Sequence, residues 1–555
     1  MTNTKERADH VVSAALMRQV VVASSAGTAF EWYDFFIFGT LSTVLAKAFF
    51  SGVSETAGFI FTLAVFGAGF AVRPIGALVF GWFGDKVGRK KTFIVTVTLM
   101  GLATIGIGLL PTYAHAGILS PALLIALRIV QGFAVGGEYG GAVVYVAEHA
   151  PQKRRGQYTA WIQIAASFGL IGALSVILLT RKTLGEADFA AWGWRIPFLI
   201  SAGLLAISLW MRAKLGESPA FKQMQEEGAG SHAPIGEAFT RWRYLKVVLI
   251  ALFALLIAQG AIWYTTFFYS QFFLEKVLKL ESASVNLFMI VVCVASAPFY
   301  VLFGALSDRI GRKPVMLTGM VVAAIAIIPV FQMMTQAGVP ALAAAARSAP
   351  VTVVADPADC SVQFDPIGKA VFMSSCDIAK SALTNAGVSY ANRSAPTGAQ
   401  ARVLVGEQSI ASPSAKGLAP PQAKALKASS EAQIKAALTA AGYPTAADAK
   451  AVNWPALFGA MMILVLAACA LYGPLGAALV ELFPTRIRYT ALSLPYNVGN
   501  GWIGGFLPAI SFALVAANGN MFFGLRYAVS IAAFAVLCAL VFLPETRHRD
   551  LHADD

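Results

Sequence analysis

Five ionisable side chains stand inside long apolar stretches of the sequence, where a charge needs water or a partner. They are Glu31, Asp34, Arg73, Arg128 and Glu138. Counted from the same predicted end of their stretches, all except Arg128 lie roughly 14–17 residues deep, which gives nearly equal depths at about 1.5 Å per residue. We therefore expect these groups to share one cavity, into which the longer side chain of Arg128 also reaches.

Carboxylates and guanidinium groups around a wet cavity could bind an anionic or zwitterionic solute and exchange a proton. Burial favours the protonated form of a carboxylate, whereas a nearby arginine favours its ionised form, so relative movement can load and release H⁺. The alternative is that these groups form fixed ion pairs that order the protein. For Arg73, next to Pro74 and Gly76, the sequence does not separate the two interpretations.

Further polar residues could line the same cavity. Gln131 precedes Glu138 by seven residues, which places both on one side of a helix. Tyrosines in such segments more often pack or mark the membrane interface, whereas the two asparagines, between a proline and a glycine, suit a helix that bends. The candidates in the second half of the chain are Gln259, Tyr264, Asn497 and Asn500.

A charged turn occurs twice. Gly81-Trp-Phe-Gly-Asp85-Lys-Val-Gly88-Arg89-Lys-Lys is followed about 220 residues later by Gly304-Ala-Leu-Ser-Asp308-Arg-Ile-Gly311-Arg312-Lys, each after a long apolar segment. The repeat indicates a duplicated membrane protein with two hydrophobic halves. These charges lie too close to the membrane edge to reach a midplane site, so the turns suit gating and the locking of helices. The predicted gating residues are Gly81, Asp85, Gly88, Arg89, Asp308, Gly311 and Arg312.

Composition supports a membrane protein. The chain of 555 residues is 57% hydrophobic and 13% charged, with a mean hydropathy of +0.67. It has too few ionisable groups to cover a soluble globule of this size. The net charge of +13 concentrates in short loops on one side, as the positive-inside rule predicts, so we expect no nucleic-acid partner.

Apolar runs of about 20 residues predict twelve transmembrane helices in two six-helix pseudo-repeats, an all-α membrane protein. The predicted spans are 20–48, 57–81, 92–110, 121–148, 157–180, 195–213, 245–273, 285–307, 314–335, 454–482, 489–516 and 521–543. With the N-terminus inside, the short cytoplasmic loops hold twelve lysines and arginines and the opposite loops five. We therefore expect both termini in the cytoplasm.

The predicted domains follow from these spans. They are an N-terminal bundle (1–213), a cytoplasmic linker (214–244), a C-terminal bundle (245–335 and 454–555) and an extra-cytoplasmic insert (336–453) between the ninth and tenth helices. The insert is rich in Ala, Ser and Pro, and residues 430–441 could form a short helix. Cys360 and Cys376 could form a disulfide in an exported segment, although two unpaired thiols in a poorly ordered insert remain the alternative.

The two turns resemble the signature of the major facilitator superfamily and its repeat in the second half. Four further segments are similar to motifs of that superfamily: Arg128–Tyr139 in the fourth helix, Glu217-Ser-Pro219 after the sixth, Pro544–Arg547 after the twelfth, and Glu148 with Arg154-Arg-Gly156, which parallels Glu481 with Pro484–Arg488. This resemblance covers nearly all of the chain except the insert. It implies the major facilitator fold.

Glu31-Trp-Tyr-Asp34-Phe-Phe together with Gly136-Gly-Glu-Tyr-Gly-Gly141 is similar to the metabolite:H⁺ symporter family. The resemblance implies import of proline/betaine, α-ketoglutarate, citrate or shikimate, with Arg128 a candidate for proton coupling and Glu31 and Asp34 for handling cation or substrate. It also places Tyr139 among the site residues. The insert is atypical of the family, and the tail is too short for the coiled coil of osmosensing proline/betaine carriers, which favours an organic-acid importer.

The sequence thus predicts a proton-coupled symporter that imports a small organic acid or zwitterionic metabolite by alternating access. The alternatives are a facilitative uniporter and a membrane receptor that uses the insert. We expect no enzyme activity, no metal and no cofactor, with H⁺ as the coupling ion. The expected partners are the metabolite and the lipid bilayer, and the expected state is a monomer in the bacterial cytoplasmic membrane.

Overall fold

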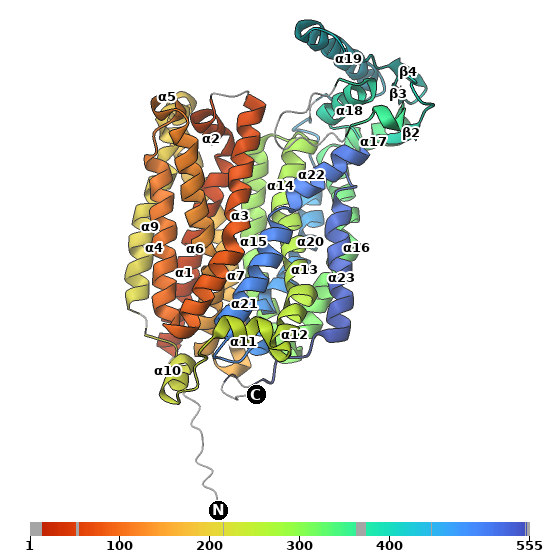
Figure 1. Ribbon diagram of the computed structural model, residues 1–555. Helices are drawn as coiled ribbons and strands as arrows, with labels where there is room; N and C mark the ends of the chain where they lie inside the picture. Colours follow the sequence, from red (N-terminus) through yellow and green to blue (C-terminus); the bar gives the residue numbers. More distant parts are fainter. Residues whose placement is uncertain are drawn as a thin grey trace, which may run out of the picture.

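The structure is a computed structural model that describes residues 14–51, 55–214, 216–361, 373–445, 447–549 and 551. Long helices run side by side in a bundle, and a small α/β domain covers one end of it (Figure 1). The first thirteen residues and residues 552–555, which we expect in the cytoplasm, lie outside the described residues.

The first half of the bundle contains long apolar helices that agree with the first six predicted spans. Short helices α5 (Tyr113–Ala116) and α8 (Glu186–Asp188) lie in its connections, and α10 (Pro219–Glu226) and α11 (Pro234–Thr240) follow it. The long helices are α1 (Ala14–Thr40) with α2 (Ser42–Phe49), α3 (Glu55–Lys86), α4 (Arg89–Leu109), α6 (Leu119–His149), α7 (Arg155–Leu184) and α9 (Arg195–Ala213).

The second half repeats this arrangement with two irregular helices. α12 (Trp242–Ala251), α13 (Ile257–Tyr264) and α14 (Ser270–Phe272) form one helical segment with π turns at Leu252–Leu256, Thr265–Tyr269 and Phe273–Val277. α21 (Arg488–Tyr496) and α22 (Leu507–Asn518) flank another π turn at Asn497–Gly504. The regular helices are α15 (Ser282–Ile310), α16 (Arg312–Gly338), α20 (Trp454–Leu482) and α23 (Leu525–Phe542). π turns are often found at functional sites.

Within the described residues, ten helical segments are long and apolar enough to cross a membrane. The chain is therefore a multi-pass membrane protein. α1 and α3 fall outside that set, although they pack in the bundle against α7 and α6 respectively. The count of twelve spans stays a prediction.

The two halves meet along α3 with α21 and along α7 with α15 and α20. Small residues permit these contacts: a Cβ on Gly81 would lie 2.8 Å from the Thr490 Cα, and one on Gly304 would lie 2.6 Å from the Gly156 carbonyl oxygen. Gly81 and Gly304 are the first residues of the two repeated segments. Small residues at helix interfaces in membranes allow the two backbones to pack closely.

The insert is a folded α/β domain, which the all-α prediction missed. Its helices are α17 (Pro340–Ser348), α18 (Ser375–Ala386) and α19 (Pro420–Ala440), and α19 begins ten residues before the predicted helix. Its strands are β1 (Val351–Ala355), β2 (Ala391–Ser394), β3 (Arg402–Val405) and β4 (Gln408–Ala411). They form a sheet in the order β2-β1-β3-β4, in which only β1 and β2 are parallel. Alternating residues of β1 and β3 are buried beneath the helices, as expected for a sheet covered on one face.

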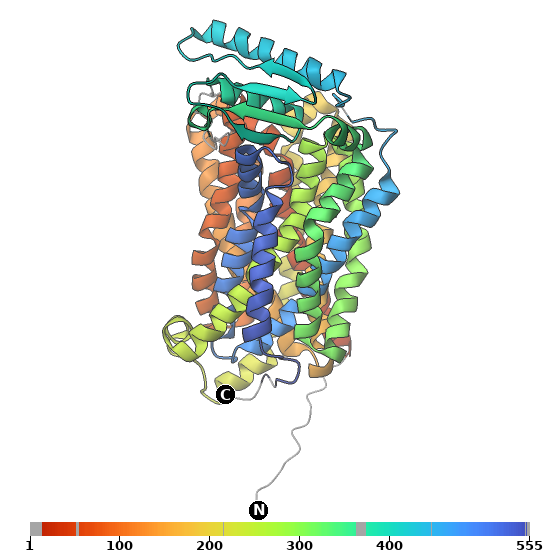
Figure 2. The same cartoon turned by 90° about the vertical axis from the view of Figure 1, so that its right-hand side faces the viewer.

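At the end of the bundle remote from the charged turns, the insert contacts loops of the second half (Figure 2). The Tyr390 amide donates to the Gly519 carbonyl at 3.0 Å, and the Lys279 ammonium donates to the Asn385 carbonyl at 2.7 Å. The Asn453 amide donates to the Ala337 carbonyl at 2.8 Å where the chain returns to the bundle. The insert is therefore tied to two turns, one between the α12–α14 segment and α15 and the other between α22 and α23.

Cys360 and Cys376 form a disulfide, which confirms that sequence prediction. The bond joins Cys360, in the turn that follows β1, to Cys376, the second residue of α18. We expect the double variant Cys360→Ser/Cys376→Ser to lower the stability of the insert by about 3 kcal/mol, because the closed loop of about 15 residues restricts the unfolded chain. Hydrogen exchange of α18 in the full chain measures this. Cys538→Ser, a change of a free cysteine in α23, is the matched control, and equal exchange in the two variants would contradict the expectation.

Candidate functional site

A small cavity lies between the halves where α1, α3 and α6 face the irregular α21–α22 segment. Its volume is about 30 Å³, enough for at least one water. Six of the predicted site residues line it, together with Trp32: Glu31, Arg73, Glu138, Tyr139, Asn497 and Asn500. We call this space the central cavity.

Glu138 is the buried group of the central cavity that is least satisfied. Its side chain is 1% exposed, and among the described residues neither carboxylate oxygen accepts a hydrogen bond. Arg73 lines the same cavity, with its guanidinium over the rings of Phe70 at 4.3 Å and Phe35 at 5.2 Å. A buried carboxylate without hydrogen bonds is costly unless it is protonated or meets a ligand, so Glu138 is suited to bind a proton or a cation.

Glu31 forms an ion pair that the sequence did not predict. Arg212, in the last turn of α9, donates to the Glu31 carboxylate at 2.9 Å. Its guanidinium lies over the Phe93 ring at 3.4 Å and passes next to Gly27, where a Cβ would come within 2.1 Å of a guanidinium nitrogen. The missing side chain of Gly27, one turn before Glu31, was the signal in the sequence. Arg212 sits near a span end, where an arginine is expected to turn toward the interface.

Asp34, Arg128 and Gln131 do not line the central cavity. The Ser201 hydroxyl donates to Asp34, and Asp34 also interacts with Thr104. Arg128 donates to Gln131 at 2.8 Å, and Gln131 donates to the Thr104 hydroxyl at 2.6 Å. The expectation of one shared cavity therefore holds for Glu31, Arg73 and Glu138 but is wrong for these three residues. Three residues of α1 turn by about 300°, which directs Asp34 into the first half.

Aromatic and amide side chains of the second half complete the central cavity. The rings of Tyr139 and Tyr496 stack across the halves with centroids 3.6 Å apart. Asn497 donates to the Gly136 carbonyl at 2.8 Å, and Asn500 donates to Gln259 at 3.1 Å. Gln259 therefore contacts the lining residue Asn500 but does not itself line the central cavity.

Toward the insert, a larger cavity of about 260 Å³ opens between α1, α7, α15 and the α12–α14 segment. Aromatic rings separate this outer cavity from the central one. Trp32 lies 5.4 Å from Trp263, and Phe36 stacks on Phe268 with centroids also 5.4 Å apart. Tyr264 stacks on Phe268 and belongs to this aromatic layer. Each contact between α1 and the α12–α14 segment joins the two halves.

At the opposite end, each repeated aspartate accepts hydrogen bonds from a helix N-terminus of the other half. Asp85 accepts from the amides of Tyr489 at 3.2 Å and Thr490 at 2.8 Å, in the first turn of α21. Asp308 accepts from the amides of Gly156 at 2.9 Å and Gln157 at 2.8 Å, in the first turn of α7. Free amides and the helix dipole stabilise a carboxylate at this position.

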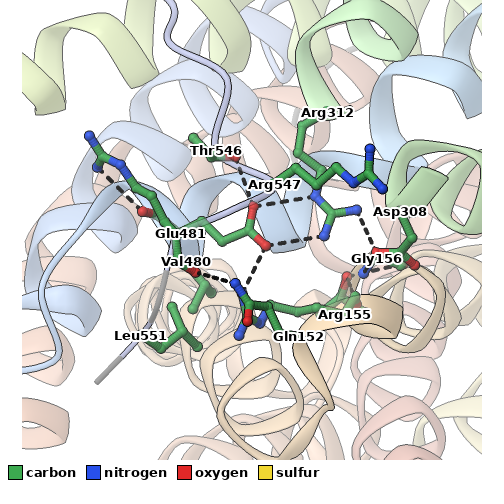
Figure 3. Close-up of polar contacts among 12 residues, drawn as sticks. Gln152, Arg155, Gly156, Asp308, Arg312, Val480, Glu481, Thr546, Arg547 and Leu551 are labelled. Atoms are coloured by element: carbon green, nitrogen blue, oxygen red, sulfur yellow. Dashed lines mark hydrogen bonds and ion pairs between the residues drawn. The ribbon is translucent and has the colours of Figure 1, made fainter. Parts of the chain in front are cut away.

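Two glutamates strengthen the same junction by reciprocal ion pairs. Glu148 of the first half pairs with Arg488 of the second at 2.8 Å. Glu481 of the second half pairs with Arg155 of the first at 2.9 Å, and also with Arg312 at 3.1 Å (Figure 3). Their side chains are almost fully buried. We call Asp85, Asp308, Glu148 and Glu481 with their partners the charged junction.

The glycines after the two aspartates have a separate role. Gly88 and Gly311 adopt φ of 126° and 110°, which a residue with a Cβ rarely adopts. The next helices begin directly there, and Glu217 accepts from the Arg89 amide at 3.1 Å as Glu545 accepts from the Arg312 amide at 2.9 Å. The arginine side chains return to the aspartates, at 2.9 Å for Arg89 with Asp85 and 2.6 Å for Arg312 with Asp308.

Two family models match the sequence. Residues 25–355 match the family model described as Major Facilitator Superfamily, and residues 432–554 match the model described as Sugar (and other) transporter. Both describe transporters and not enzymes, as the sequence predicted.

Among curated proteins, the chain is 35% identical over 328 residues to the Proline/betaine transporter of Escherichia coli K12, covering 58% of this chain and 65% of that protein. It is also 35% identical over 328 residues to the Shikimate transporter of the same organism, covering 58% and 73%. The matched region thus spans just under two thirds of the proline/betaine carrier. Because the two identities are equal, they do not separate an organic acid from a zwitterion.

Among solved structures, the fold resembles the proton:xylose symporter XylE bound to 6-bromo-6-deoxy-D-glucose, with a TM-score of 0.64, 17% identity and 98% of each chain covered. A partially occluded inward open conformation of XylE from E. coli matches with a TM-score of 0.58, 16% identity and coverage of 97% and 100%. These likenesses confirm the predicted fold.

The charged junction generates one prediction. Asp308→Asn removes the charge that accepts from two helix amides and from Arg312, and breaking one partner of a buried pair costs about 3–5 kcal/mol. We expect this end of the bundle to open more often, so that Ser493→Cys, on α21 behind the junction, reacts at least tenfold faster with an impermeant thiol reagent applied from that end. The background replaces Cys293, Cys469 and Cys538 by Ser. Asp188→Asn, at an exposed position of α8, serves as the control. An unchanged labelling rate in Asp308→Asn would show that the junction does not hold this end closed.

Proposed function

Because the chain belongs to the major facilitator superfamily, we propose that it is a secondary active transporter that imports a small organic acid or zwitterionic metabolite together with H⁺. Transport proceeds by alternating access in the bacterial cytoplasmic membrane, with both termini inside and the insert outside. The observation that carries the proposal is Glu138, a fully buried carboxylate that faces the central cavity, accepts no hydrogen bond from a basic or amide group among the described residues, and has the Glu31 carboxyl as its polar neighbour.

Glu138 and Glu31 supply the proton site. Both line the central cavity and interact electrostatically with one another, while Arg212 neutralises Glu31. A proton on Glu138 removes the cost of burying a second negative charge beside the first. When the cavity opens to water on the other side, hydration favours release of that proton.

A second buried network adjoins this site. Arg128, Gln131, Thr104 and Asp34 form a chain of polar contacts within the first half. Because α1 carries both Asp34 and Glu31, a shift of α1 moves the two carboxylates together. Arg128 therefore acts on coupling through this network and not by contact with the solute in the central cavity.

Arg73, Asn497 and Asn500 supply the solute site. A guanidinium suits a carboxylate, and the amides add hydrogen bonds from the second half. The rings of Trp32, Tyr139 and Tyr496 suit the apolar body of the solute or an attached ammonium group. The central cavity, at about 30 Å³, is smaller than a metabolite site of about 300–1,000 Å³. Solute entry therefore requires the aromatic layer to separate.

The charged junction supplies the inner gate. It joins the halves at the end where the basic turns lie, while the outer cavity opens at the insert end. Rocking of one half against the other would separate Asp85 and Asp308 from their helix N-termini and expose the central cavity at that end. The gate and the aromatic layer lie on opposite sides of the central cavity, as alternating access requires.

A symporter, a uniporter and a receptor predict different results in proteoliposomes with an imposed inward pH gradient. Labelled proline, betaine, shikimate, and di- and tricarboxylates are the solutes to screen. Accumulation that disappears with an uncoupler supports symport, equilibration without accumulation supports a uniporter, and ligand response without uptake supports a receptor. Deletion of residues 340–450 distinguishes a receptor from a symporter, because a symporter retains uptake without the insert.

We expect Glu138→Gln to abolish gradient-driven accumulation while solute exchange at equal pH is retained, because an amide fills the same space but cannot bind and release H⁺. Uptake and counterflow are measured on the same vesicles. Glu186→Gln, an exposed carboxylate of α8, is the matched control. Accumulation at the wild-type level in Glu138→Gln would exclude Glu138 as the proton site.

We also expect Arg128→Ala to abolish accumulation and leave folded protein in the membrane. The change removes the guanidinium that donates to Gln131, and through Gln131 and Thr104 it loosens the network that holds Asp34 in place. Arg128→Lys tests whether the positive charge alone is sufficient, because lysine keeps the charge but lacks the planar set of hydrogen-bond donors of arginine. Normal accumulation by Arg128→Ala would remove this residue from the coupling mechanism.

A further inference from the structure

A third cavity, of about 220 Å³, lies outside the membrane domain where the insert meets the turn between the α12–α14 segment and α15. Its walls come from α18, α19 and the turn itself. α19 contributes Glu431, Lys435 and Thr439, and the turn contributes Lys279. We call it the insert cavity. It has no part in the transport mechanism described above.

Two lysines line the insert cavity, one from each of the elements that meet there. Lys279 belongs to the membrane domain and Lys435 to the insert, and among the described residues neither forms an ion pair. Burial and the neighbouring Lys435 lower the pKa of Lys279. Two like charges held at one cavity repel each other, and an anion between them would relieve that repulsion.

The backbone at Lys279 supports a specific role for this side chain. Lys279 has a φ of 56°, and it is the one non-glycine residue with positive φ in the described part of the chain. Such a conformation is unfavourable for a residue with a Cβ and persists where surrounding contacts impose it. The ammonium donates to the Asn385 carbonyl at 2.7 Å, which directs it to the wall of the cavity.

The remaining lining defines the chemistry of a ligand. Glu431 is the one carboxylate among the lining residues, so the site carries a net charge of one positive unit and suits a monoanion. Leu438, Val388 and Ala382 offer an apolar wall, and Thr439 and Tyr443 add hydroxyl groups. The volume exceeds the roughly 150 Å³ of a cavity that holds benzene. An organic anion therefore fits better than a bare inorganic one.

We propose that the insert cavity is a binding site for a small organic monocarboxylate, held between Lys279 of the membrane domain and Lys435 of the insert. The bound carboxylate joins the insert to the turn that follows the α12–α14 segment. The site does not depend on the proposed transport function, since binding can be measured on a chain that transports nothing.

Equilibrium binding of labelled benzoate to the full chain in phosphatidylcholine nanodiscs tests the proposal. All variants carry Arg73→Gln, which removes the guanidinium of the central cavity. We expect Lys279→Gln and Lys435→Gln each to weaken binding about tenfold, as the loss of about 1.4 kcal/mol implies. Lys424→Gln, an exposed lysine of α19 outside the lining, should bind normally. Glu431→Gln should bind more tightly.

Thr439→Trp provides a test that does not change charge, because the indole fills the insert cavity and leaves both ammonium groups; we expect it to abolish benzoate binding. Circular dichroism of each variant checks its fold. Unchanged binding in Lys279→Gln and Lys435→Gln, or no benzoate binding to the parent chain, would overturn the site. Displacement of benzoate by inorganic phosphate at equal concentration would overturn the assignment of an organic carboxylate.

Discussion

The burial of charge between the two halves is the interaction on which the observed state depends. Asp85 and Asp308 each accept from helix amides that belong to the opposite half. Glu148 and Glu481 reach across in the same way to Arg488 and Arg155. Because removing one partner leaves a buried charge unpaired, these contacts are expected to form or break together. Such an all-or-none junction suits a gate with two discrete positions.

The two ends of the bundle are closed by different forces. The charged junction is directional and requires each partner at hydrogen-bond distance. The aromatic layer of Trp32, Phe36, Trp263 and Phe268 uses ring contacts, which tolerate sliding and separate without leaving unpaired charges. In the proposed transport cycle, a solute that enters from the outer cavity would therefore meet the more adaptable barrier, and it would bind near Arg73 and Glu138 before the directional junction has to open.

The insert is attached to one half of this mechanism. Its bonds to Lys279, Ala337 and Gly519 link the outer turns of the second half. A rigid-body motion of that half would carry the insert with it. The insert cavity lies at one of these attachments, so the insert is placed to sense a ligand without blocking the central cavity.

The sequence by itself determined the membrane class, the repeat between the two halves and the superfamily, and it offered the disulfide as one of two alternatives. Each rests on local information: apolar length, a repeated turn, and two cysteines in a segment outside the spans. It also marked Glu31, Asp34, Arg73 and Glu138 by their matching depth, because buried charges are rare in apolar helices, and all of these except Asp34 line the central cavity.

Only the tertiary structure decided which partner each charge has. Rotation about α1 separates Asp34 from Glu31, and the space at Gly27 admits Arg212 from a distant helix. The reciprocal ion pairs of Glu148 with Arg488 and of Glu481 with Arg155 likewise need both halves in place. The sheet of the insert escaped prediction because its strands are only four or five residues long and two of them show no buried alternation. Periodicity reports which face of an element is buried, whereas pairing across elements depends on rotation and packing that no single segment encodes.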